Sequence, residues 1–404
     1  MSSKYIFVLG RDQNLAKLEI VSILKQAEFD YEIEIDGANY LVITFKDKLN
    51  VNALMQRLAG TVRIAEVFSE PEGVTLQNFD VDLDIDIDKL DIYFPNKFNY
   101  TVHSLDDDAK LESEVYQLFK AHFKKYKIKA IKKSFSFSRK IGEDFEFLLV
   151  RENDSNNADA NTSANANAGK ILLARSVAAP DPNIYMEKDN DRPARKFTHG
   201  TSFRLAQMMV NILDVPLGKT VIDPFCGTGT FIIEGLLKGY NMIGIDIEQP
   251  LIEASKQNLN WAKKRFGFEG KYELIQADST EVKFNADGCV FEPYMGEFLK
   301  KLPNFEKAKK DIEKLEKFYA KFFRNLTKNL NSASEYKNNA RIVCILPYYR
   351  TNDNRLVHLS DRFFTQLPFK HVDLEKEFGL NLLNPIEYFT PSGSMISRQL
   401  HIFE

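Results

Sequence analysis

The sequence from Thr220 to Asp246 constrains the fold more than any other part of this chain. It opens with T-V-I-D-P-F-C-G-T-G-T, in which Val221 and Ile222 indicate the end of a buried strand. Asp223-Pro224 ends that strand, because proline has no N–H for a central ladder. Residues 231–238 then predict a helix, and 241–246 a second apolar strand that ends in a carboxylate. A strand, a glycine turn, a helix and a strand with a terminal acid form a βαβ unit that binds a nucleoside.

The turn itself narrows the choice of nucleoside. A dinucleotide fold has the pattern G-x-G-x-x-G, whose amides hold a pyrophosphate. Here the third glycine is missing, and Asp223 lies four residues before Gly227. A carboxylate at that position repels a pyrophosphate but suits a sulfonium or an ammonium group. The turn therefore favours S-adenosylmethionine over a dinucleotide, with Asp246 accepting hydrogen bonds from the two ribose hydroxyls.

This stretch resembles motif I of the class I S-adenosylmethionine-dependent methyltransferases, and in particular the THUMP-domain enzymes that methylate N2 of guanosine in tRNA. The resemblance covers residues 170–404 well and the N-terminal part loosely. It implies a Rossmann-like domain with a seven-stranded sheet that contains one antiparallel strand, and it places an adenine acceptor at Asp278. The residues expected to bind the cofactor are Asp223, Phe225, Cys226, Gly227, Thr228, Gly229, Thr230, Asp246, Ile247, Ala277, Asp278 and Ser279.

The loop after the fourth strand of that domain, Glu292-Pro293-Tyr294, is expected to face the transferred methyl group. The resemblance implies Asp or Asn, then Pro-Pro, then Tyr or Phe at this place. Here there is one proline and a longer acid, so Glu292 either replaces the usual acid in a shortened loop or occupies the position of the first proline. We expect Glu292, Pro293 and Tyr294 to be the catalytic residues, with Tyr294 stacking on a base turned out of its helix.

The N-terminal half predicts two smaller α+β parts. Residues 1–90 read as a small module followed by a linker, in which alternating aspartates at 80–88 form an acidic edge rather than a metal site. Residues 91–183 resemble a divergent THUMP domain, interrupted by a low-complexity loop at 152–169. Residues 184–404 form the methyltransferase domain. A polar connector is expected at 180–196, and His199 is a candidate for the cofactor pocket.

A basic stretch in the second part is the candidate RNA contact. The chain carries a formal net charge of −3, so nucleic-acid binding requires a local patch. No acid lies between Glu114 and Glu143, and lysines alternate there with Phe123, Tyr126 and Ile128. This composition suits phosphate contact beside a packed face. The residues expected to bind RNA are Lys124, Lys125, Lys127, Lys129, Lys132, Lys133, Arg139 and Lys140.

The remaining features limit the class of protein. The three cysteines, Cys226, Cys289 and Cys344, lie far apart in apolar runs, which indicates buried, reduced thiols in a cytoplasmic protein. No apolar run is long enough to span a membrane, and no metal-ligand spacing is found. The main expectation is a tRNA methyltransferase. A DNA amino-methyltransferase and a non-catalytic RNA-binding protein with a degenerate acceptor loop are the alternatives, and the oligomeric state is left open.

Overall fold

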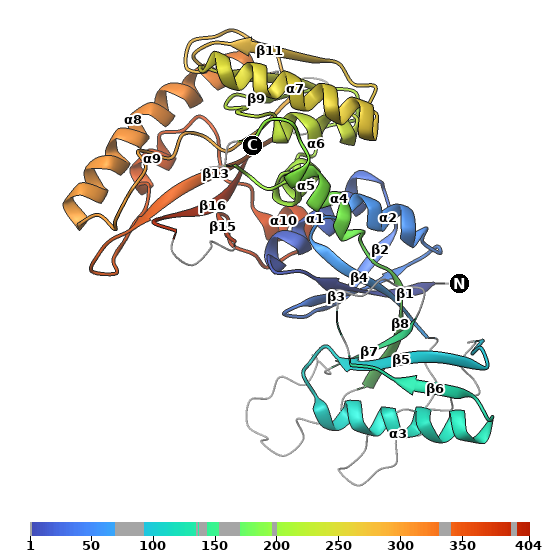
Figure 1. Ribbon diagram of the computed structural model, residues 1–404. Coiled ribbons are helices and arrows are strands. Elements are labelled where there is room, and N and C mark those ends of the chain that lie inside the picture. The colour runs from blue at the N-terminus through green and yellow to red at the C-terminus, as the bar shows by residue number, and fades with distance from the viewer. Residues whose placement is uncertain are drawn as a thin grey trace. The chain divides into compact units, whose positions relative to one another are not determined.

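The computed structural model describes residues 2–68, 93–134, 136, 144–152, 170–195, 200–330, 341–388 and 394–404 (Figure 1). The chain divides into two compact units. The first contains Met1–Gln13 and Glu28–Asp181, and the second contains Asn14–Ala27 and Pro182–Glu404. The aspartates at 80–88, most of the low-complexity loop and His199 lie outside the described residues. No helix within the described ranges is long and apolar enough to cross a membrane.

The first unit is one mixed sheet of eight strands in the order β2-β3-β1-β4-β8-β7-β5-β6. The antiparallel pairing of β4 with β8 joins the strands of the opening module to those of the segment after residue 91. The strands are β1 (Ser3–Leu9), β2 (Tyr31–Asp36), β3 (Tyr40–Phe45), β4 (Thr61–Val67), β5 (Lys97–Ser104), β6 (Lys129–Lys132), β7 (Asp144–Glu152) and β8 (Lys170–Ala178), and the helices are α2 (Val51–Arg57) and α3 (Ala109–Lys125).

Helix α3 covers the β5–β7 end of this sheet (Figure 1). Its apolar residues recur at helical spacing, so Phe119 and Phe123 lie on one buried face. Phe119 stacks on Phe147 of β7 with ring centroids 4.5 Å apart, and Phe123 meets Phe98 of β5 edge to face at 5.2 Å. This aromatic packing leaves the charged face and the C-terminal end of α3 to solvent.

The second unit is the Rossmann-like domain, and its sheet runs β11-β10-β9-β12-β13-β16-β15, with the short β14 paired to β13. The neighbouring pairs from β11 to β13 are parallel, and β16 is antiparallel to both of its neighbours. The expected seven strands with one antiparallel strand are therefore found, with β14 added. The bounds are β9 (Thr220–Asp223), β10 (Asn241–Asp246), β11 (Tyr272–Gln276), β12 (Gly288–Phe291), β13 (Arg341–Arg350), β14 (Leu356–Val357), β15 (Ile386–Glu387) and β16 (Ile396–Phe403).

The helices of this unit include α1 (Gln13–Gln26), which packs here although it lies between β1 and β2 in the chain. The side chain of Asn211 in α5 donates to Glu19 Oε1 of α1 at 2.7 Å, and Gln26 donates to the carbonyl of Asn211 at 2.7 Å. The others are α4 (Pro182–Asn190), α5 (Phe203–Ile212), α6 (Thr230–Lys238), α7 (Gln249–Phe266), α8 (Phe305–Asn329), α9 (Asp361–Thr365) and α10 (Leu374–Phe378).

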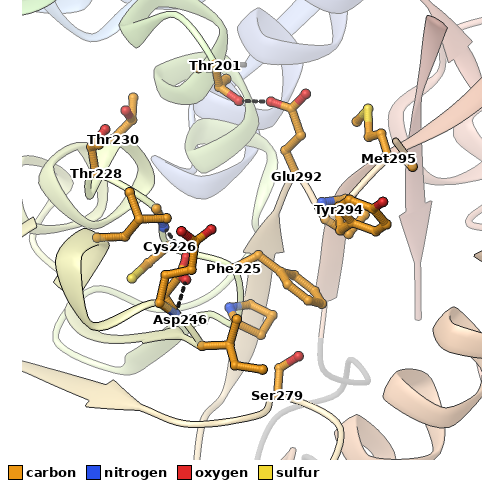
Figure 2. A pocket seen from close by; sticks show the side chains of 18 of the residues that line it. Thr201, Phe225, Cys226, Thr228, Thr230, Asp246, Ser279, Glu292, Tyr294 and Met295 are labelled. Carbon is orange, nitrogen blue, oxygen red and sulfur yellow. Dashed lines mark hydrogen bonds between the residues drawn. The ribbon is translucent and has the colours of Figure 1, made fainter. Parts of the chain in front are cut away.

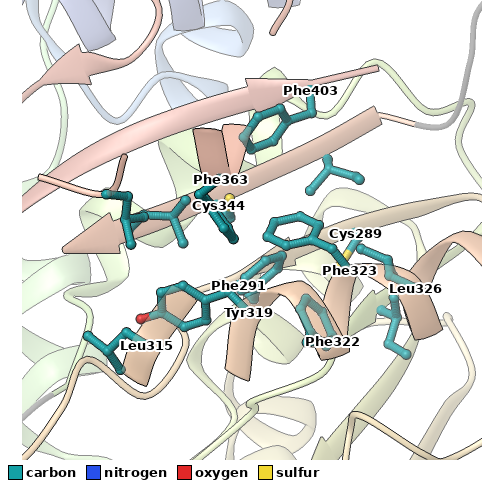
Figure 3. Packing of buried hydrophobic residues seen from close by; sticks show 14 of the residues in the cluster. Cys289, Phe291, Leu315, Tyr319, Phe322, Phe323, Leu326, Cys344, Phe363 and Phe403 are labelled. Carbon is teal, nitrogen blue, oxygen red and sulfur yellow. The ribbon is translucent and has the colours of Figure 1, made fainter. Parts of the chain in front are cut away.

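Helix α8 buries one long apolar stripe against the sheet (Figure 3). Its residues Tyr319, Phe322 and Phe323 are fully buried, and Phe322 meets Phe291 of β12 with ring centroids 5.2 Å apart. Cys289 and Cys344 lie in the same cluster, and Cys226 is also buried, which confirms the prediction of buried thiols. This packing fixes the end of β12, where the acceptor loop begins.

Three segments have a secondary structure that the sequence did not predict. The expected polar connector contains α4, which buries Tyr185 and Lys188. The basic stretch expected to contact RNA contains the strand β6, which pairs parallel to β5. Residues near 369–374 form an isolated bridge between His371 and Phe403, followed by α10, because Asp373 accepts a hydrogen bond from the Lys376 N–H and caps a helix there.

Candidate active site

The turn after β9 has the backbone that its glycines predict. Gly227 and Gly229 have φ of +52° and +86°, in the left-handed region that favours glycine. A Cβ at Gly229 would overlap the hydroxyl of Ser255 in α7. The Gly229 N–H donates to the Cys226 carbonyl at 2.8 Å, and α6 begins at the next residue. The turn is therefore tight and lies against α7.

Asp246 ends β10 beside this turn. Its Oδ2 accepts from the Gly227 N–H at 2.9 Å, and its Oδ1 accepts from the Glu248 N–H at 2.9 Å. Both oxygens keep a second lone pair, so the carboxylate remains an acceptor for a pair of hydroxyls. The next side chain, Ile247, is 65% exposed and offers an apolar surface next to that acceptor. An acceptor beside an apolar surface suits the ribose and adenine of a nucleoside.

Asp223 supports the backbone of the turn from a buried position. It is 1% exposed, its Oδ1 accepts from the Phe225 N–H at 3.1 Å, and its Oδ2 has no partner. Burial, together with the nearby charges of Asp246 and Glu292, raises the pKa of Asp223 well above its usual range. Asp223 and Gly229 thus shape the turn without lining the cavity in front of it.

The acid of the acceptor loop is held by two partners from distant segments. Glu292 directly follows β12, and its side chain is 10% exposed. Its Oε2 accepts from the hydroxyl of Thr201, which precedes α5, and its Oε1 lies 3.3 Å from Nη1 of Arg398 in β16. Figure 2 shows the Thr201–Glu292 contact at the edge of the pocket. The carboxylate is therefore fixed in orientation and paired with a cation.

Two buried tyrosines hold the backbone of the same loop. The Tyr319 hydroxyl of α8 donates to the Tyr294 carbonyl at 2.7 Å, and the Tyr349 hydroxyl of β13 donates to the Met295 carbonyl at 2.8 Å. With its backbone held, the Tyr294 side chain is 56% exposed. Tyr349 itself is 1% exposed, so its role is to support the loop.

The cofactor turn, Asp246 and the acceptor loop line one cavity of about 950 Å³ (Figure 2). It brings together the acceptor loop and ten of the twelve residues expected at the cofactor: Phe225, Cys226, Gly227, Thr228, Thr230, Asp246, Ile247, Ala277, Asp278 and Ser279. A nucleoside cofactor and a base fit this size of site. Thr201, Phe318 and Arg398 also line it and were not predicted, because tertiary packing brings them there and no local motif marks them.

Asp278 also holds the backbone and side chain of its own loop. Its Oδ1 accepts from the Thr280 N–H at 2.8 Å and from the Thr280 hydroxyl at 2.7 Å. The bond from the Thr280 N–H is the main cause that holds the pKa of Asp278 below its usual value. Asp278 is exposed and lines the cavity, so a charged acceptor is present where the adenine amine is expected.

The segment before α5 is fastened to the cofactor turn. The Asn258 side chain of α7 donates to the carbonyls of Ala194 and Thr228 at 2.9 and 2.8 Å, and accepts from the Ala194 N–H at 2.9 Å. Arg192 donates to the Thr230 hydroxyl at 2.9 Å. The turn is thus braced from two sides.

The basic surface of the first unit consists of the C-terminal end of α3 and the strand β6. All its described lysines are exposed, which suits phosphate contact: Lys124, Lys125, Lys127, Lys129, Lys132 and Lys133. Because β6 extends along the sheet edge, these charges follow a strand as well as a helix end. Arg139 and Lys140 lie outside the described residues.

Comparisons with known proteins agree with this site. Residues 192–351 match the family model of an RMKL-like methyltransferase domain, and residues 33–257 match a DNA methylase model. A tRNA (guanine(10)-N2)-dimethyltransferase of Methanothermobacter thermautotrophicus is 32% identical over 163 residues, and one of Methanocaldococcus jannaschii is 40% identical over 76 residues. The matches cover 40% and 19% of this chain, and 44% and 22% of the length of these relatives.

Two solved structures share the fold over nearly the whole chain. TrmN from Thermus thermophilus has a TM-score of 0.55 at 13% identity and covers 99% of both chains. A possible methylase from Clostridium difficile has a TM-score of 0.51 at 13% identity and covers 100% of this chain and 98% of its own. At this identity the likeness concerns the fold alone.

Proposed function

This chain belongs to the class I S-adenosylmethionine-dependent methyltransferases, and from that premise we propose that it methylates the exocyclic amine of a guanosine in tRNA. The observation that carries the proposal is the single cavity that joins the glycine turn and Asp246 to the Glu292-Pro293-Tyr294 loop. The substrate is suggested by the relatives named tRNA (guanine(10)-N2)-dimethyltransferase. Because those matches cover only part of each relative, the substrate is proposed for this chain.

The residues in the cavity fit the cofactor. Asp246 is placed to accept from the ribose hydroxyls, Ile247 offers an apolar surface to the adenine, and Asp278 is an acceptor for its amine. The Asp246 carboxylate beside the turn suits a positively charged group and disfavours a pyrophosphate, whereas the buried Asp223 does not face the cavity. When bound, S-adenosylmethionine supplies an electrophilic methyl group, so the protein's task is to position the acceptor.

The acceptor loop then acts on the target amine. An exocyclic amine of guanine is a weak nucleophile, because its lone pair is conjugated with the ring. The Glu292 carboxylate, held by Thr201 and Arg398, would accept a hydrogen bond from the amine N–H, stabilise the positive charge that develops on nitrogen, and take the proton that the nitrogen loses when it is methylated. The exposed ring of Tyr294 would stack on the base and help to hold its amine toward the bound methyl donor.

In this proposal, the first unit binds the RNA. Its basic surface supports phosphate contact, which positions an RNA without reading its sequence. We propose the division into a module at 1–90, a THUMP-like domain at 91–183 and the methyltransferase domain at 184–404. A cytoplasmic location accords with a tRNA substrate.

The proposal is tested by incubating the protein with labelled cofactor and either unmodified tRNA or duplex DNA. Label in the guanosine of tRNA is the expected result. Label only in DNA would favour the DNA amino-methyltransferase, and tRNA binding without any transfer would favour the non-catalytic protein.

Two variants assign the roles of the acids. Asp246→Ala should abolish cofactor binding in calorimetry. Glu292→Ala should leave cofactor binding intact and lower kcat about 10²- to 10³-fold. Glu281→Ala, which removes a surface acid paired with Lys321, is the matched control and should change neither quantity. An unchanged kcat in Glu292→Ala would remove Glu292 from the mechanism.

A further inference from the structure

Glu292 and Arg398 place a charged acceptor and a charged donor side by side in the cavity. Arg398 Nη1 lies 3.3 Å from Glu292 Oε1, and the Arg398 side chain is 26% exposed. Both residues line the cavity, as does the exposed ring of Tyr294. A guanidinium has five N–H donors and each carboxylate oxygen has two lone pairs, so the pair keeps donors and acceptors beyond its own contact.

This arrangement matches one edge of guanine. Along its Watson–Crick edge, guanine presents the O6 acceptor, then the N1–H donor, then the N2 amine, which is the proposed methyl acceptor. We propose that Arg398 donates to O6 while Glu292 accepts from N1–H and the N2 amine, so that the pair selects guanine in the site. The inference rests on the proposed function and assigns Arg398 as its specificity-determining residue.

Adenine does not match the same pair. Its edge presents an amine donor at C6 and an unprotonated N1, so an N–H would face the Arg398 guanidinium and a lone pair would face the Glu292 carboxylate. Sites that use buried charged groups to read a substrate reject a base that leaves those groups unpaired. Glu292 is 10% exposed, so water has little access to replace the missing hydrogen bonds.

The test compares two tRNAs that both carry the 2-amine. One has guanosine at the methylated position, and the other has 2-aminopurine, which lacks O6 and the N1 proton. The wild-type protein should prefer guanosine. Arg398→Met should lower kcat/KM for both tRNAs, because Arg398 also holds Glu292, but the fall should be roughly 10-fold larger for the guanosine tRNA, which alone loses the contact to O6. Arg362→Met, which changes an exposed arginine of α9, is the control and should alter neither value.

A merely structural role for Arg398 would give a different pattern. If Arg398 only orients Glu292, kcat/KM falls by the same factor for both tRNAs, and the inference is overturned. It is also overturned if neither value changes. Cofactor affinity and melting temperature, measured on each variant, show whether the fold is preserved.

A binding measurement separates this inference from the proposed function. The protein is saturated with the demethylated cofactor, so that no transfer occurs, and is titrated with a pyrimidine oligonucleotide that carries one central guanine or one 2-aminopurine. Preference for guanine that is lost in Arg398→Met supports the inference even where no methyl transfer to tRNA is seen. Equal binding of both oligonucleotides by the wild-type protein refutes it.

Discussion

The substitution Gly296→Ala is expected to disturb the acceptor loop and to leave the cofactor turn intact. Gly296 has φ of +104°, and a Cβ there would overlap the hydroxyl of Tyr349. Alanine in the left-handed region costs roughly 1–2 kcal/mol. Displacing the Tyr349 hydroxyl would also break its bond to the Met295 carbonyl and leave a buried group unpaired, which costs about 1–3 kcal/mol. The two effects together weaken the native loop by about 2–5 kcal/mol.

Activity should respond more than cofactor binding does. The overlap moves the backbone of the loop that carries Glu292, and a misplacement of about 1 Å costs on the order of 10²-fold in rate. We therefore expect kcat to fall by about that factor in the tRNA assay, while calorimetry gives a cofactor Kd within twofold of the wild-type value, because the atoms nearest to a Cβ at Gly296 belong to Tyr349 and Leu315 and not to the turn at Gly227–Thr230.

Gly379→Ala is the matched control. Gly379 has φ of +67° at the end of α10, but a Cβ there would meet no atom within 4 Å. Gly379→Ala introduces the same backbone strain as Gly296→Ala but no steric overlap. It should therefore lower the melting temperature slightly and leave kcat unchanged. Equal kcat in Gly296→Ala and Gly379→Ala would show that the contact between Gly296 and Tyr349 does not shape the acceptor loop.

Three further outcomes are expected. Replacing three lysines of the basic surface by glutamine should weaken tRNA binding. The slope of the logarithm of the binding constant against the logarithm of salt concentration should also become less steep, by nearly one for each phosphate contact that is lost. Three lysine changes on α8 should alter neither quantity. Burial lowers the pKa of His371 to about 4 and that of His401 well below its usual value, so the unfolded chain takes up protons first as pH falls. The urea midpoint should thus drop between pH 6.5 and 4, and less so in His401→Phe. Lys188→Met leaves the buried carboxylate of Glu234 unpaired and should cost about 3–5 kcal/mol, which the added change Glu234→Leu should partly restore.

The cofactor half of the site was predictable because its signals are local. The turn, α6 and the acid of β10 lie within 27 consecutive residues, and each is specified by a residue type with one conformational use. Glycines mark the positive φ values, and the carboxylate is the last residue of an apolar strand. Parallel pairing of β9, β10 and β12 then brings their carboxyl ends to one edge of the sheet.

The partners of Glu292 could not be found in this way. Arg398 reaches the site because β16 pairs antiparallel with β13, in a register that sets Arg398 opposite Pro347. A shift of one residue in this pairing would turn Arg398 to the other face of the sheet. Thr201, the other partner of Glu292, lies just before α5, far from Arg398 in the sequence. No spacing in the sequence predicts that Arg398 or Thr201 contacts Glu292.

The mispredicted elements β6 and α4 also depend on tertiary contacts. The strand β6 is rich in lysine, and its pattern matches a solvated helix end better than a strand, yet pairing with β5 makes it extended. Helix α4 lacks an apolar stripe, because one of its two buried side chains is Lys188, held by Glu234 at 2.6 Å. A buried ion pair replaces the apolar contact that would have marked this helix in the sequence.

The departure of the acceptor loop from the usual pattern is best explained together with Arg398. A glutamate is one methylene longer than an aspartate, and here that length carries the carboxylate to both Thr201 and Arg398. A shorter acid at the same backbone position would lose at least one of these partners, and Arg398 would remain beside the cavity without its counter-charge. Glu292 and Arg398 therefore form one unit, and the replacement of either should be judged by its effect on the other, as the Glu292→Asp and Arg398→Met double-mutant cycle would measure. Additive losses in kcat/KM would show that the two side chains act separately, whereas a double variant no worse than Arg398→Met alone would show that the arginine makes the glutamate effective.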